Sequence, residues 1–99
     1  MEDQPLVRAI RLWTGYGDLA WPRRDEAAVF REFGEADGKK LLATLKILED
    51  QFYVSEANST APDLIEMGVQ AAADFRLKYP DAPEAVVDAF TWCYTFDHK

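Results

Sequence analysis

Arginines and aromatic residues are interleaved in the N-terminal third of the chain, and side chains of these types can bind an anion. A guanidinium group holds a carboxylate or phosphate through forked hydrogen bonds, and an aromatic ring can form a wall of such a site. The segment WTGYGDLAWPRR also contains two glycines and a Trp-Pro step, which are typical of an irregular loop. Loops held by a rigid scaffold often carry binding residues. The residues of this possible loop site are Trp13, Tyr16, Trp21, Arg23 and Arg24.

A structural role is the alternative for the same residues. The tryptophans would then belong to the core, and the arginines would pair with the many acids of the C-terminal half. The net charge of −7 argues against a nucleic acid or an anionic membrane as the partner, because such a field repels phosphate groups.

The acids themselves are the second candidate, because they are concentrated late in the chain. Residues 51–99 carry eight acids and three bases. If the last two helices are antiparallel neighbours, their acids could form one face that attracts a basic protein. The alternative is an ordinary solvated surface that keeps the chain soluble. The residues of this possible acidic face are Asp63, Glu66, Asp74, Asp81, Glu84 and Asp88.

No motif in the sequence indicates a metal site or a catalytic site. The spacing of Cys93 and His98 is not a zinc pattern, and there is no second Cys or His to complete four ligands. Cys93 lies among aromatic residues and is expected to be buried, whereas His98 is expected to be solvated at the terminus. We therefore predict no catalytic residue, no metal and no cofactor.

These side chains must be positioned by helices, because the apolar residues recur at spacings of three and four and show no strand alternation. The first predicted helix is capped by Asp3 and has Pro5 in its first turn. Gly34 should end the second helix, and Asp37 should cap the third. The sequence predicts a single all-α domain, residues 1–99, built as a compact bundle of about five helices. Their approximate ranges are 4–14, 24–33, 38–54, 61–79 and 82–96.

Two of these helices are apolar on more than one side. In the third, Leu41, Leu45, Leu48 and Phe52 form the main stripe, and an opposite apolar side predicts that other helices cover both. That opposite side consists of Ala43, Ile47 and Val54. The last helix is less polar still, and we expect it to have an apolar surface to spare for a partner.

The connections between the last helices carry capping and packing signals. Thr60 to Asp63 and Asp81 to Glu84 read as capping boxes at the starts of the fourth and fifth helices. Gly68 and its small neighbours predict a close approach of another helix to the fourth.

The function that these features favour is a small acidic cytoplasmic protein-binding domain. One cysteine fits a reducing compartment, and neither a signal peptide nor a membrane-spanning run is recognisable. In size and charge the chain is similar to the acidic helical inhibitors of bacterial toxin–immunity systems, although no motif carries that likeness. The leading hypothesis is an inhibitor of the immunity-protein or antitoxin type that occludes a basic partner. One alternative is an accessory or self-associating subunit that uses the aromatic last helix, and the other is a small-molecule anion-binding domain that uses the loop site. The chain is expected to be a monomer or a homodimer.

Overall fold

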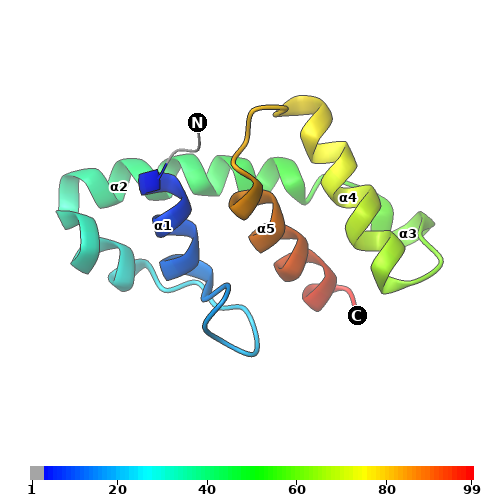
Figure 1. Ribbon diagram of the computed structural model, residues 1–99, viewed down its shortest axis with the longest axis horizontal. Coiled ribbons are helices and arrows are strands. Elements are labelled where there is room, and N and C mark those ends of the chain that lie inside the picture. The colour runs from blue at the N-terminus through cyan, green and yellow to red at the C-terminus, as the bar shows by residue number, and fades with distance from the viewer. Residues whose placement is uncertain (1–3) are drawn as a thin grey trace.

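The structure is a computed structural model that describes residues 4–99. Within this range the chain forms five helical segments and no strand, which confirms the predicted all-α bundle (Figure 1). The predicted cap of the first helix, Asp3, lies outside the described residues. The elements are α1 (Gln4–Thr14), α2 (Glu26–Phe52), α3 (Ala57–Thr60), α4 (Leu64–Lys78) and α5 (Glu84–Asp97).

Helix α2 combines the second and third predicted helices, which meet at a sharp kink (Figure 1). Gly34 has φ 82° and ψ 171° at this point, a backbone conformation that is essentially restricted to glycine. The helix resumes at once, so the predicted connection through residues 35–38 was wrong, as was the prediction that Asp37 is a cap. Gly38 instead packs against Phe30, whose ring would lie 2.8 Å from a Cβ atom at residue 38.

The core is centred on α5, which contacts both α1 and α4 and lies between them (Figure 1). Phe52 near the end of α2 has its ring centroid 5.2 Å from that of Phe75 on α4 and 5.9 Å from that of Phe90 on α5. These aromatic contacts join the end of α2 to α4 and to the middle of α5. The buried side chains of α5 point to more than one side, which explains why this helix is the central one. They are Val86, Val87, Ala89, Phe90, Cys93 and Tyr94.

Helix α2 is covered on one side only, so the prediction that both of its apolar sides are covered was wrong. Leu45, Leu48 and Phe52 of the main stripe are buried, but Ile47 and Val54 on the other side are 59% and 56% exposed. The reason is that α5 takes the central position, and α1 and α4 pack around it on the same side of α2. The exposed large apolar side chains of the helices lie mainly on α4 and not, as expected, on the last helix. They are Leu64, Ile65, Val69 and Leu77.

One buried hydroxyl group, that of Tyr94 on α5, holds the polar segment that follows α2. Tyr94 of α5 donates to the carbonyl oxygen of Ser55 at 2.8 Å and accepts from the backbone N–H of Asn58 at 3.1 Å. Tyr94 is fully buried, so these hydrogen bonds join the segment that follows α2 to the core.

Both predicted capping boxes differ from the structure. Asp63 itself caps α4, because its carboxylate accepts the backbone N–H of Glu66 at 2.8 Å, and Thr60 belongs to α3. At α5 the capping residue is Pro83, which makes no side-chain hydrogen bond there. No helix in residues 4–99 is both long enough and apolar enough to cross a membrane.

Candidate functional site

The six acids of the predicted face fall into separate groups. Asp63 and Glu66 lie at the start of α4, whereas Asp81 and Glu84 lie where α4 ends and α5 begins. Because α4 has 15 residues, these two groups are about 22 Å apart along the helix. Asp74 accepts a hydrogen bond from the Ser55 hydroxyl at 2.7 Å and so faces the segment that precedes α3. Each group lies on the C-terminal half of the fold, with Asp88 one turn further along α5.

The arginines do not neutralise these acids. All four ion pairs among residues 4–99 join partners between residues 8 and 49: Arg8–Glu32, Arg23–Asp25, Arg24–Glu49 and Lys46–Glu26. The predicted pairing of arginines with acids of the C-terminal half was therefore wrong. Arginines of α1 and of the α1–α2 loop lie beside α2, so the acids of α2 reach them first. The eight acids after residue 50 have no ion-pair partner within the described range.

The aromatic residues of the possible loop site do not come together as one wall. Trp13 is 2% exposed in the core, whereas Trp21 is 64% exposed. Tyr16 packs against Trp92 of α5, with ring centroids 5.6 Å apart. The loop is closed at its base, because the N–H groups of Arg23 and Asp25 donate to the carbonyl oxygens of residues 14 and 13 at 2.9 and 2.8 Å.

Arg24 has its hydrogen-bond donors engaged inside the protein. Its Nε donates to Oε2 of Glu49 at 2.7 Å, and its Nη1 donates to the carbonyl oxygen of Arg23 at 2.8 Å. The guanidinium carbon lies 5.1 Å from the ring centroid of Trp13, a cation–π contact. Arg24 therefore clasps the loop to α1 and α2, and Arg23 is itself paired with Asp25 at 3.7 Å.

A polar depression of about 510 Å³ lies beside this clasp. It contains two guanidinium groups and three carboxylates, so its charge does not favour an anion. The Tyr53 hydroxyl donates to Asp97 at 2.6 Å across it. Burial and this hydrogen bond raise the pKa of Tyr53 above its usual value, so the phenol keeps its proton at neutral pH. The lining residues are Pro22, Arg23, Arg24, Glu49, Asp50, Tyr53 and Asp97.

Cys93 and His98 are far from any reactive arrangement. Burial raises the pKa of the Cys93 thiol to about 11, despite the nearby Arg24. The thiol is therefore protonated and unreactive at neutral pH. The ring of His98 packs on Tyr94 at 4.4 Å between centroids. Within residues 4–99 no three His, Cys, Asp or Glu side chains lie close enough to hold a metal ion.

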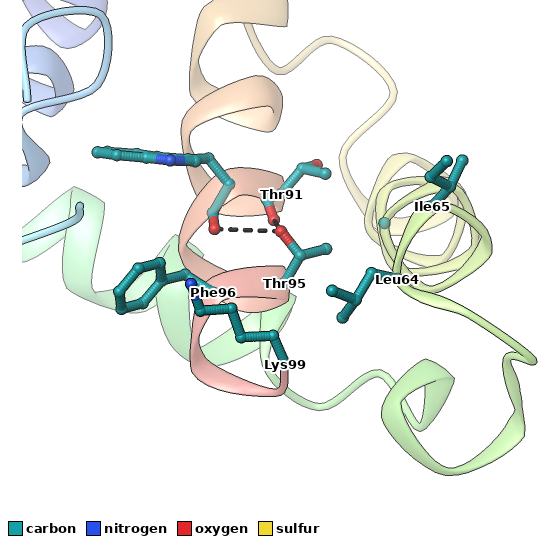
Figure 2. Close-up of a pocket in the computed structure, with 8 residues that line it drawn as sticks. Leu64, Ile65, Thr91, Thr95, Phe96 and Lys99 are labelled. Atoms are coloured by element: carbon teal, nitrogen blue, oxygen red, sulfur yellow. Dashed lines mark hydrogen bonds between the residues drawn. The ribbon is translucent and has the colours of Figure 1, made fainter. Parts of the chain in front are cut away.

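An apolar groove of about 390 Å³ lies between α4 and α5 and is the feature that the sequence did not place (Figure 2). Leu64 and Ile65 come from α4, and Thr91, Thr95 and Phe96 come from α5 (Figure 2). Gly68, Trp92 and Lys99 complete the lining. The sequence signals that could have located the groove were the helical glycine and the aromatic last helix, but neither shows which side chains face each other.

The groove has a narrow floor and larger walls. A Cβ atom at Gly68 would lie 3.0 Å from the methyl group of Thr91 and 3.3 Å from that of Thr95, which confirms the predicted close approach. The hydroxyls of both threonines donate to backbone carbonyls of their own helix, at 2.8 Å to Val87 and 2.9 Å to Thr91. The polar groups of the floor are thus already hydrogen-bonded.

The arrangement as a whole offers two features: unpaired acids on the C-terminal half and an apolar groove among them. Neither places a nucleophile beside a base among the described residues. Comparison of the chain with protein-family models, with curated proteins and with solved structures finds no match.

Proposed function

We propose that the chain is a small non-catalytic protein-binding domain that takes a basic protein on its C-terminal half and occludes the surface it covers. The observation that carries this proposal is the absence, within residues 4–99, of any ion pair for the eight acids after residue 50. Acids without an ion-pair partner in the fold can form ion pairs across an interface.

The three bases of the same half offset only part of the charge of its eight acids, and none of them forms an ion pair within the described residues. Lys78 donates to the side-chain oxygen of Gln51 at 3.2 Å, and Lys99 lies 4.2 Å from the ring centroid of Phe96. A surface with this excess of one sign speeds the encounter with an oppositely charged partner and discriminates against acidic ones. An inhibitor that must find a basic target quickly would benefit from both effects.

The spacing of the acids defines what such a partner needs. The groups at the two ends of α4 are about 22 Å apart, so one partner would need basic side chains on a surface at least that long. This length is within a standard protein–protein interface, which buries roughly 800 Å² on each side. A single small basic ligand could not span it.

The test compares two triple variants with the same net charge. One variant removes acids from α4 and α5, and its control removes exposed, unpaired acids from the N-terminal half. The test variant is Glu66→Gln, Glu84→Gln and Asp88→Asn. The control variant is Asp18→Asn, Glu35→Gln and Asp37→Asn. None of the six acids has an ion-pair partner among the described residues, so neither variant removes an ion pair of the fold.

Partners are captured from the native host with the wild type and both variants, identified by mass spectrometry, and titrated at two salt concentrations. We expect a basic protein that the control variant retains and the test variant loses, with weaker binding at high salt. Equal retention by both variants would show that the C-terminal acids do not bind the partner, and equal loss would show that only net charge matters. Either result would refute the proposal.

A further inference from the structure

The α4–α5 groove has an apolar wall that no part of the described chain covers. Ile65 is 79% exposed and Val69, one turn further along α4, is 58% exposed. Leu64 and Phe96 stand nearer the seam between the two helices (Figure 2). Exposed apolar side chains that adjoin a groove are typical of a surface that another chain covers.

The floor of the groove restricts the conformation of the segment that can occupy it. The lining belongs to two helices whose backbone groups are hydrogen-bonded internally, and the hydroxyls of Thr91 and Thr95 bond to their own helix. An extended segment would bury N–H and C=O groups with no partners in such a groove. A helix satisfies its own backbone, so it can be buried there without this penalty.

The charges around the groove restrict the sequence of that helix. Asp63 immediately precedes Leu64 at one end, and Asp88 extends the stripe of Thr91 and Thr95 by one turn toward the other end. Lys99, the only charged residue among the described residues that line the groove, lies over Phe96. The carboxylate of Asp88 has no ion-pair partner among the described residues, so it favours a positive charge on the part of the bound helix that lies over it.

From these features we infer that the groove binds an amphipathic helix of the partner, with large apolar side chains on one face and basic residues at the end that lies over Asp88. This inference rests on the proposed function and names the element of the basic partner that docks. An apolar side chain enters between Ile65 and Phe96 and contacts the small floor at Gly68, as a knob enters a hole in ordinary helix packing.

The experiment uses the full chain and a displayed library of helical 16-residue peptides. The chain contains three isoleucines, which provide internal probes: Ile10 is buried, Ile47 is exposed on α2, and Ile65 is exposed at the groove. The chain is selected against the library, and an enriched peptide is titrated into protein carrying ¹³C-labelled isoleucine δ1 methyl groups. Binding is then measured by fluorescence anisotropy with variants.

We expect enriched peptides with apolar residues at helical spacing and basic residues at one end, and a titration that shifts the Ile65 signal alone. Ile65→Ser should weaken binding at least about tenfold, whereas the matched control Ile47→Ser should leave it within about twofold. Asp88→Asn should weaken binding and reduce its salt dependence.

Three results would overturn the inference: no enrichment of basic amphipathic sequences, a shift of Ile47 in place of Ile65, or equal effects of the two isoleucine substitutions. A concentration-dependent shift of Ile65 without peptide, together with a dimer in sedimentation, would assign the groove to a second copy and also overturn it. If the partner captured above is lost by the acid variant but retained by Ile65→Ser, the groove is refuted while the proposed function stands.

Discussion

The buried hydroxyl of Tyr94 offers the sharpest test of what holds this fold together. The substitution Tyr94→Phe keeps the ring, with its contact to Phe52 at 5.7 Å between centroids, and removes only the oxygen. Two backbone groups then lose their partner: the carbonyl of Ser55 and the N–H of Asn58. Ser55 is buried as well, so water does not readily replace the hydroxyl at its carbonyl.

The expected loss follows from these two groups. A buried polar group left without a partner costs about 1–3 kcal/mol, and because Asn58 is exposed its N–H recovers part of its hydrogen bonding from water. We therefore expect Tyr94→Phe to lower the free energy of unfolding by about 2 kcal/mol. For a domain of this length that corresponds to a drop of roughly 8–16 °C in Tm.

The assay is urea unfolding followed by circular dichroism, with Tyr79→Phe as the matched control. Tyr79 also packs its ring on a core phenylalanine, at 5.1 Å between centroids, but its hydroxyl makes no hydrogen bond within the described chain. The control should change stability by less than about 0.5 kcal/mol. The m-value should be unchanged in both variants, because neither alters the surface that unfolding exposes. A Tyr94→Phe variant as stable as the control would refute the reasoning.

Three further predictions concern backbone strain, helix packing and pH. Gly34→Ala should destabilise the fold by about 1–3 kcal/mol in thermal unfolding, because φ 82° and ψ 171° are unfavourable for alanine; an unchanged Tm would contradict this. Gly68→Ala should be less stable than Gly68→Ala combined with Thr91→Ser, because serine lacks the methyl group 3.0 Å from the added Cβ; urea midpoints decide the order. The pKa of the Cys93 thiol is about 11 in the folded protein, against 9.0 in the unfolded chain, so the folded state holds the proton more tightly. The free energy of unfolding therefore falls as the pH rises from about 9 to 11. Cys93→Ala should show less of this fall in urea titrations across that range, and an identical pH profile would count against it.

The helical class and the approximate helix positions were predictable because they depend on local signals. Gly34 and Pro80 interrupt the helical pattern, and Leu45, Leu48 and Phe52 recur at helical spacing, so the elements and their main buried stripe follow from residues close in sequence. The kink of α2 was harder to predict from the sequence. A glycine after a helix predicts an end, but the direct restart at the next residue depends on Gly38 packing against Phe30.

The site was less predictable because its parts come from distant segments. Arg24 could have paired with any of the 18 acids by composition alone, and its choice of Glu49 depends on where the loop lies against α2. The groove depends on Gly68 facing Thr91 and Thr95, a register between two helices that periodicity does not fix. The exposed side of α2 likewise depends on competition for the central position, which α5 occupies.

The closed base of the loop between α1 and α2 determines where the chain can accept an insertion. The backbone hydrogen bonds of residues 23 and 25 close the loop into a ring that is fastened to the end of α1, and the clasp of Arg24 reinforces the closure. The tip, from Gly17 to Ala20, is exposed, and its N–H groups at Asp18 and Leu19 donate at 2.9 Å to the carbonyl oxygen of Gly15 in the same loop. Doubling the length of such a tip costs only about 0.6 kcal/mol in closure entropy. The tip is therefore the place where the chain can accept an inserted epitope or a fluorescent label while its helices and its groove keep their positions.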